Sequence, residues 1–173
     1  MNTLKEPRRP DGVSATGERT EVVVPILKLN SILVPIDFSK ISQKALDYAV
    51  PLAKQFGAKI TLLHAIEPPP YSIDLTYVPM GEGLPTGPMK KELDAFAKKM
   101  IEPELLKDVI VQVGTAFDVI TNVARDFKVD LIVITTHGRT GLKHVFMGST
   151  AERVVRHAPC PVFVVRKRDH TFG

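Results

Sequence analysis

The segment LIVITTHGRTGLKHVFMGST, residues 131–150, determines how the rest of the chain is interpreted. It joins an apolar strand, 131–134, through a glycine-containing loop to the start of a helix. This is the order of a phosphate-binding loop, because glycines let backbone N–H groups approach an anion and the first N–H groups of a helix point toward it. Ser149 and Glu152 also have the spacing of a capping box, which would make the segment a capped helix without a ligand. The segment alone leaves both interpretations open.

Five short apolar segments alternate with four helical patterns along the chain. This alternation predicts right-handed crossovers and a parallel sheet with helices on both faces, that is, a doubly wound α/β domain. In such sheets ligands bind beyond the carboxyl ends of strands where the winding direction reverses, and both Asp37 and the glycine loop fall at such ends. The expected strands are 31–36, 59–66, 109–113, 131–134 and 162–165. The first expected helix runs from Ser39 or Ser42 to Gly57 and the second covers 89–101. The third begins at Thr115, and the fourth runs from the glycine loop to about His157.

Pro51 lies inside the first helical pattern. Proline in a helix interior removes a hydrogen bond and costs about 3 kcal/mol. We therefore expect a kink or a break near Asp47 to Val50.

Three stretches lie outside the core pattern. Residues 1–30 are expected to be a mobile N-terminal extension and residues 169–173 a tail, so that the domain spans 31–168. The segment 67–88 holds six prolines and three glycines, too many for regular structure. It could be a lid, a binding surface or a loose insertion, and the sequence does not choose among these.

Length and composition are those of one globular domain: 173 residues, 44% hydrophobic and 24% charged. No apolar run approaches the ~18 residues of a membrane-spanning helix, which excludes a membrane protein. Residues 1–30 carry no signal-peptide or transit-peptide pattern, so we expect a cytoplasmic protein. The single cysteine, Cys160, fits that compartment because it cannot form an internal disulfide. Lying between Pro159 and Pro161, it is expected to pack rather than to react.

The net charge of +4 and the pI of about 9.2 allow a nucleic-acid partner without requiring one. The basic residues lack interleaved aromatics and no recognition helix stands out, so nucleic-acid binding is the least favoured function. Positive charge collects around the glycine loop, where it would suit a small polyphosphate. Arg153 and Arg156 are nevertheless expected to be solvent-facing helix-end cations. The cations between 138 and 168 are Arg139, Lys143, Arg153, Arg156, Arg166, Lys167 and Arg168, against Glu152 alone.

Four motifs together resemble the universal stress protein family over residues 32–166. The resemblance implies a five-stranded parallel sheet of order 3-2-1-4-5. It also implies a homodimer through the last strand (Val162, Phe163, Val164 and Val165), and an apolar edge strand does need a partner. The motifs are Ile32-Leu-Val-Pro-Ile-Asp-Phe-Ser39, Leu62-Leu-His-Ala65, Gly138 followed after nine residues by Gly148-Ser149, and Ala158-Pro-Cys-Pro-Val-Phe-Val-Val165.

One branch of this family binds ATP through a glycine, two residues, a second glycine, nine residues, and a third glycine followed by Ser or Thr. Gly138, Gly148 and Ser149 match this pattern, whereas Thr135 occupies the first glycine position. A β-branched side chain there would crowd a ligand that needs bare backbone. Gly141 gives the loop additional conformational freedom. The resemblance therefore still implies nucleotide binding, and a pocket that binds no nucleotide is the alternative.

The resemblance also implies the contacts. Asp37 would face the ribose or base, the backbone of Ala65 would bond to the adenine edge, and Pro35 and Ile36 would line the base pocket. The phosphates of ATP, ADP or AMP would meet the glycine loop and the helix start, with Mg²⁺ held largely by phosphates and water. No protein-only metal motif such as HExxH or paired cysteines occurs. The predicted site residues are Pro35, Ile36, Asp37, Ala65, Thr135, Gly138, Arg139, Thr140, Gly141, Gly148, Ser149, Thr150 and Ala151.

Three functions remain open. The first is a stress-response regulatory or signalling protein that binds adenine nucleotide and whose output is a conformation or a partner contact. The second is an enzyme such as a slow ATPase, with Asp37 or His137 as a conceivable base, although neither a Walker A lysine nor an acid–base pair is evident. The third is an interaction dimer that binds no nucleotide. The sequence identifies neither the stress nor the partner protein.

Overall fold

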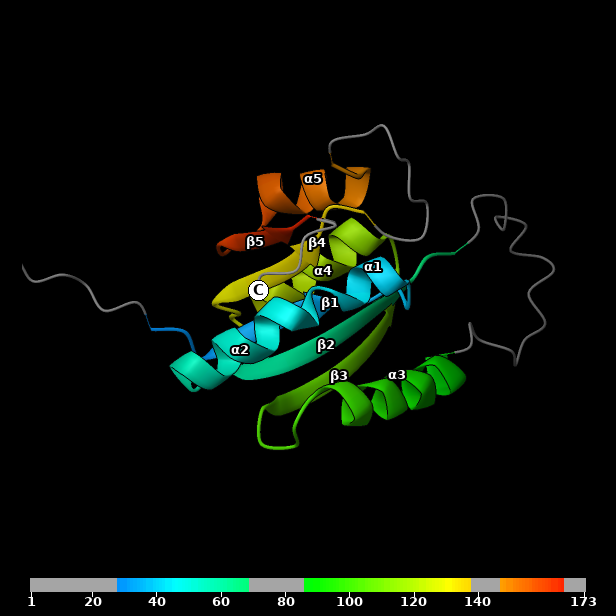
Figure 1. Ribbon diagram of the computed structural model, residues 1–173. Helices are drawn as coiled ribbons and strands as arrows, with labels where there is room; N and C mark the ends of the chain where they lie inside the picture. The colour runs from blue at the N-terminus through cyan, green and yellow to red at the C-terminus, as the bar shows by residue number, and fades with distance from the viewer. Residues whose placement is uncertain (1–27, 69–85, 138–146, 167–173) are drawn as a thin grey trace, which may run out of the picture.

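The computed structural model describes residues 28–68, 86–137 and 147–166. Its centre is one parallel sheet in the order β3-β2-β1-β4-β5, which confirms the predicted topology (Figure 1). The switch point of such a sheet lies between β1 and β4, where successive crossovers turn in opposite directions. The strands are β1 (Ser31–Pro35), β2 (Lys59–Ile66), β3 (Leu106–Val113), β4 (Leu131–Thr135) and β5 (Val162–Val165).

Helices cover both faces of the sheet. Helices α2 and α3 pack on one face, in a core that includes Ile32 and Val34 of β1, while α4 and α5 pack on the other, in a core that includes Leu33 (Figure 1). Successive residues of a strand point to opposite faces, so a strand buried on both sides is a continuous apolar run. The helices are α1 (Lys40–Gln43), α2 (Leu46–Phe56), α3 (Thr86–Met100), α4 (Ala116–Asp126) and α5 (Ser149–His157).

The first crossover is broken, but one turn earlier than predicted. Ser39 is the N-cap of α1 and its hydroxyl accepts a hydrogen bond from the Ser42 amide at 3.0 Å. The chain leaves regular α-helix at Lys44 and Ala45, where amides bond three residues back instead of four. Pro51 lies inside α2, so its missing amide is accommodated without a break beside it. The distortion is instead taken up by the tightened turn at Lys44 and Ala45, which separates α1 from α2.

Two predicted boundaries are wrong for identifiable reasons. Strand β3 begins at Leu106 rather than residue 109, because it is an edge strand whose exposed charged positions, Lys107 and Asp108, do not interrupt pairing. Helix α3 begins at Thr86 rather than residue 89, which removes 86–88 from the predicted irregular segment. Pro88 is compatible with the first helical turn, where its missing N–H has no helical partner in any case.

Several predictions lie outside the described residues. They concern the extension up to residue 27, the greater part of the segment 67–88, the loop 138–146 and the residues from 167 onward. The division into an extension, a domain and a tail stays a prediction. Within the described parts of the chain, no helix is long and apolar enough to cross a bilayer.

Candidate functional site

The end of β4 and the start of α5 are tied together by backbone hydrogen bonds. The Thr136 amide donates to the Val165 carbonyl at 2.9 Å, which continues the pairing with β5 one residue beyond the end of β4. The Gly148 amide then donates to the Thr136 carbonyl at 2.7 Å. The chain therefore leaves the sheet at His137 and returns to the same point before entering α5.

Gly148 is the N-cap of α5, with φ −68° and ψ 153°. Any residue can adopt this conformation, so the requirement for glycine is space: an added Cβ would lie 3.0 Å from the Thr136 carbonyl oxygen. The capping-box alternative is wrong, because Ser149 is already the first helical residue and the N-cap residue, Gly148, has no side chain that could cap the helix. Glu152 instead pairs with Arg156 at 2.9 Å. The first amides of α5 thus begin beside a strand end and follow an N-cap residue that has no side chain.

Thr135 is the last residue of β4, and its hydroxyl bonds to the backbone just after the strand. The Oγ1 atom donates to the His137 carbonyl at 2.9 Å, and the residue is buried. Strand alternation places this side chain on the same face as Val133, which packs in the core under α2 and α3. Ala151 packs in the core on the opposite face, with α4 and α5. The Thr135 side chain is consequently directed away from the face on which α5 lies.

The carboxyl end of β1 turns sharply at Asp37. Its Oδ1 atom accepts from the Ser39 amide at 2.9 Å, and its own amide donates to Ser42 Oγ at 3.3 Å. The bond from the Ser39 amide is that of an Asx-type turn, in which the side chain substitutes for a backbone acceptor. Phe38 follows with φ 62°, a left-handed conformation that non-glycine residues rarely adopt. Asp37 is half-buried at the turn, beside the end of the sheet.

Ala65 lies where β2 extends beyond β1. The last residue pair between the two strands is Pro35 with Leu63, and the Leu63 carbonyl accepts from the Ile36 amide at 2.8 Å. Residues two apart in a strand direct their backbone groups to the same neighbour. The N–H and C=O of Ala65 therefore face the space past the end of β1, where the chain has already turned away at Asp37.

Residues 28–166 match the model of the Universal stress protein family. The chain belongs to this family. Universal stress protein YxiE of Bacillus subtilis is 34% identical over 152 residues, which cover 79% of this chain and 99% of that protein. The structure of protein MJ0577 of Methanocaldococcus jannaschii has 28% identity and a TM-score of 0.70, covering 83% of this chain and all of that one. A universal stress protein in complex with cAMP, at 22% identity and TM-score 0.59, shares the fold over 82% of this chain and 100% of that one.

In this universal stress protein the described site residues lie at the carboxyl ends of β1, β2 and β4 and at the start of α5. Asp37 and Ala65 lie at adjacent strand ends, and Gly148 to Ala151 form the start of α5. The side chain of Ile36 is buried in the core shared with α2 and α3, so only its backbone reaches the strand end. Pro35 is half-buried on the opposite face. Gly138, Arg139, Thr140 and Gly141 lie outside the described residues.

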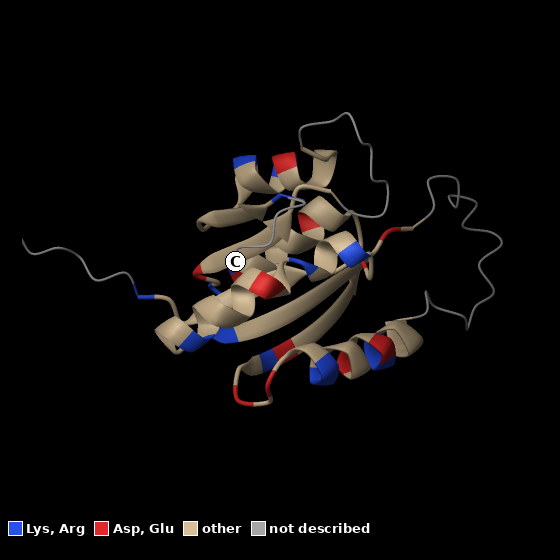
Figure 2. Cartoon of the chain, viewed as in Figure 1, with Lys and Arg blue, Asp and Glu red and all other residues tan. Residues whose placement is uncertain are grey.

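The two α5 arginines already have partners on the protein. Arg153 lies over the Phe117 ring at 4.1 Å, and Arg156 forms the exposed pair with Glu152. Their predicted solvent-facing role agrees with these contacts. Basic and acidic residues are interspersed along the described ribbon (Figure 2). No group of three or more metal-ligating side chains occurs within the residues that the structure describes.

His64 is the site residue for which sequence reasoning found no role. It is buried at 7% exposure, its Nδ1 atom lies 2.7 Å from the Ile36 carbonyl oxygen, and its ring contacts Phe38 at 4.9 Å between centroids. The available signal was a histidine inside an otherwise apolar strand, Lys59–Ile66. A polar ring at such a position needs a partner, and here the partner is the turn that carries Asp37.

Proposed function

We propose that this universal stress protein binds an adenine nucleotide in the space between the carboxyl ends of β1, β2 and β4. The observation that carries the proposal is the Gly148–Thr136 hydrogen bond of 2.7 Å, because it sets the first turn of α5 against the end of β4 without an intervening side chain. Helix N-termini attract anions through their unpaired amides and the helix dipole. The phosphates would lie against Gly148 to Ala151 and against the loop that begins at Gly138.

The base and ribose would lie on the β1–β2 side of this space. The backbone of Ala65, which faces past the end of β1, supplies one donor and one acceptor for an adenine edge. Asp37 would accept from the ribose or the base through a carboxylate oxygen, while Oδ1 keeps its bond with Ser39. Pro35 lies on the same face of the sheet as Ala65, whereas Ile36 would contribute backbone only. A protein of this fold has been solved with cAMP, so the fold accommodates an adenine nucleotide.

ATP with Mg²⁺ is the proposed form of the ligand, with ADP or AMP as alternatives. The ion would be held by phosphate oxygens and water, because the described residues offer no cluster of carboxylates or imidazoles for it. The hydroxyls of Ser149 and Thr150 lie in the first turn of α5 and would add donors to the phosphates.

A regulatory role is favoured over catalysis. Asp37 Oδ1 accepts from Ser39, and His137 Nδ1 lies 3.0 Å from Thr136 Oγ1, so both conceivable bases have local partners. A group that is already held by a neighbour is less available as a general base, and we therefore keep slow hydrolysis as the secondary possibility. The output would be a stress-response signal transmitted in the cytoplasm through a conformation or a protein contact.

We place the homodimer at β5. This strand is at one edge of the sheet and its Phe163 side chain is 41% exposed. Edge strands with exposed apolar side chains pair readily with another chain. The interaction dimer without nucleotide remains the alternative function of the same fold.

The experiment that tests nucleotide binding uses the untreated protein. The full chain is purified without added ligand, denatured by heat, and the supernatant is separated by ion-pair chromatography. We expect adenine nucleotide in stoichiometric proportion, or otherwise a rise in Tm when ATP and Mg²⁺ are added. Absence of both results would favour the interaction dimer.

A further inference from the structure

The two edge strands of the sheet differ in the charge that they carry. β3 and β5 are the outer strands of the order β3-β2-β1-β4-β5, so each is paired on one side only within the described residues. The sequence of β5 is VFVV, without a charge, whereas β3 is LKDVIVQV and holds the exposed Lys107 and Asp108. Unpaired edges attract further strands, and charged side chains on an edge oppose this.

Alternation along β3 identifies the backbone groups on its free side. The Gly114 amide donates to the Ile66 carbonyl at 2.9 Å, so the backbone of Gly114 faces β2. The N–H and C=O of one strand residue point to the same side, and those of the next residue point to the other. The register with β2 is unbroken over 108–113. The residues whose N–H and C=O face away from the sheet are therefore Val109, Val111 and Val113.

The regular part of this edge is short. Ile60 is paired with Leu106 and Thr61 with Asp108, so Lys107 is an extra residue in β3. Such a bulge increases the local twist and interrupts regular pairing. A second strand along this edge would consequently have only the segment 109–113 to pair with, and each of its three outward residues counts.

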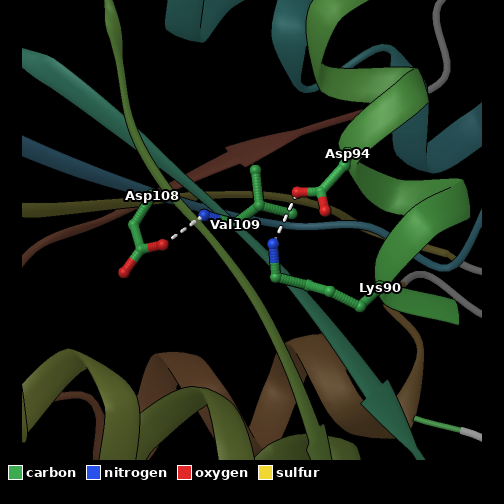
Figure 3. A network of polar contacts seen from close by, with 4 residues as sticks. All are labelled: Lys90, Asp94, Asp108 and Val109. Atoms are coloured by element: carbon green, nitrogen blue, oxygen red, sulfur yellow. Dashed lines mark hydrogen bonds and ion pairs between the residues drawn. The ribbon is translucent and has the colours of Figure 1, made fainter. Parts of the chain in front are cut away.

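Asp108 binds the first of the outward amides. The Val109 amide donates to Asp108 Oδ1 at 2.7 Å, and Figure 3 shows the carboxylate turned toward that nitrogen. No ion pair includes Asp108 in the parts of the chain that the structure describes. The ammonium group in the same view belongs to Lys90 of α3 and is held by Asp94 at 2.5 Å. The described partner of the Asp108 carboxylate is therefore an amide of its own strand edge.

Pairing with a second β3 edge would need this amide. Two copies related by a two-fold axis place their β3 strands antiparallel, and the arrangement that uses all three outward residues is centred on Val111. Val109 of each copy then lies opposite Val113 of the other, and its amide has to donate to the carbonyl there. Asp108 already accepts from that amide. Its carboxylate oxygen would also meet the incoming carbonyl oxygen, and neither of these groups can donate a hydrogen bond.

We propose that Asp108 closes the β3 edge to the β3 edge of a second copy of this chain by occupying the Val109 amide. The segment 109–113 carries no charge, so without Asp108 its outward groups form a second surface for strand pairing. This role is independent of nucleotide binding and of the proposed dimer at β5. A dimer at β5 determines only whether the assembly formed through β3 ends at two copies or continues as an open chain.

The first test is light scattering coupled to size exclusion, with the full chain over a range of concentrations. Asp108→Ala frees the amide, and its mass at high concentration is at least twice that of the wild type. Asp108→Asn keeps an oxygen that accepts from Val109, so its mass stays that of the wild type. Asp126→Ala removes the same charge from an exposed position at the end of α4 and leaves the mass unchanged. Wild-type mass for Asp108→Ala, or an equal increase in either control, overturns the proposal.

The second test is amide hydrogen exchange by NMR, which needs no variant for its first reading. In the wild type the Val109 amide exchanges more slowly than those of Val111 and Val113, because it alone of the three has an acceptor. Equal rates overturn the proposal. In assembled Asp108→Ala the Val111 and Val113 amides become protected, and amides that face β2 keep their protection. Fast exchange of Val111 and Val113 there, or loss of protection throughout the sheet, contradicts pairing through this edge.

A second substitution separates strand pairing from misfolding. Val113→Pro removes an outward donor and no bond to β2, which an edge strand tolerates. Added to Asp108→Ala, it restores the wild-type mass. Large assemblies that persist in the double variant do not form through the β3 edge, and that result overturns the proposal as well.

Discussion

The Gly148 amide donates to the Thr136 carbonyl at 2.7 Å, and this bond joins the entrance of the glycine loop to its exit. A Cβ atom on Gly148 would lie 3.0 Å from the same carbonyl oxygen. The hydrogen bond and the need for glycine both result from the close approach of the Gly148 and Thr136 backbones. It brings the amides at the start of α5 to the switch point of the sheet, where the fold places ligands.

Thr135 is predicted to stabilise the loop rather than obstruct it. Its hydroxyl bonds to the His137 carbonyl and its side chain is on the face away from α5, so Thr135→Gly should not tighten ATP binding. Thr135→Val removes the hydroxyl and should lower the free energy of unfolding by about 1 kcal/mol. Thr135→Ser keeps the donor and serves as the control. Urea denaturation and ATP titration measure the two effects. Tighter binding by Thr135→Gly would show that the methyl group does crowd the ligand.

Asp130 connects the amino ends of β1 and β4. Its Oδ2 atom accepts from the amides of Asn30 at 2.8 Å and Ser31 at 3.0 Å, while its own amide donates to the Ser31 carbonyl. Asp130→Ala leaves two backbone donors without this acceptor and should reduce unfolding free energy by about 1–3 kcal/mol. Asp126→Ala, an exposed aspartate at the end of α4, should change it little. Equal denaturation midpoints for the two variants would contradict the assignment.

The pH dependence of Cys160 follows from its surroundings. Burial, followed by the charge of Asp130, raises the pKa of this thiol above its ordinary value, against a lowering hydrogen bond from the Ile132 backbone. The folded chain therefore keeps the proton where the unfolded chain has lost it. This contribution to stability is complete at neutral pH and is lost as the pH rises above about 8.5.

Alkylation of Cys160 provides the measurement. Iodoacetamide should react with the folded protein more slowly at pH 8.5 than with the urea-unfolded chain, because less thiolate is present. Asp130→Asn removes one cause of the raised pKa and should accelerate the reaction. A rate in the folded protein equal to that of the unfolded chain would exclude the raised pKa.

Phe163 tests the dimer at β5. Replacing this exposed edge residue by glutamate places charge on the proposed contact, so Phe163→Glu should yield monomer in light scattering coupled to size exclusion. Val113→Glu makes the same type of change at the end of the opposite edge strand, where the side chain is 39% exposed. That variant should stay dimeric. If Phe163→Glu remains dimeric, the dimer interface does not lie at β5.

The sheet could be predicted because burial on both faces produces unmistakable apolar runs. β2 was located at its observed bounds, Lys59–Ile66, and β5 at Val162–Val165. The start of β3 could not be predicted, because an edge strand tolerates charged residues and a charged stretch in a sequence is typical of a loop. The break before α2 also depends on tertiary packing, because Pro51 alone indicates only that a distortion is needed nearby.

The site was only partly predictable from the sequence. The positions of Asp37 and Gly148 followed from motif and topology, because loops after parallel strands converge at one edge of the sheet. The bond from Thr135 to His137 and the bond from His64 to Ile36 depend on side-chain directions that no spacing specifies. The capping box failed for a related reason: the close approach of Gly148 to Thr136 moved the N-cap one residue earlier.

The most direct test of the central claim is ATP binding by the wild-type chain, Gly148→Ala and Gly87→Ala, measured by calorimetry with Mg²⁺. A Cβ at Gly87 meets nothing within 4 Å, so that variant controls for the substitution itself. The account predicts saturable binding by wild type and Gly87→Ala, and its loss in a Gly148→Ala protein that still unfolds cooperatively. Wild-type affinity in Gly148→Ala, or no binding by any of the three, would contradict it.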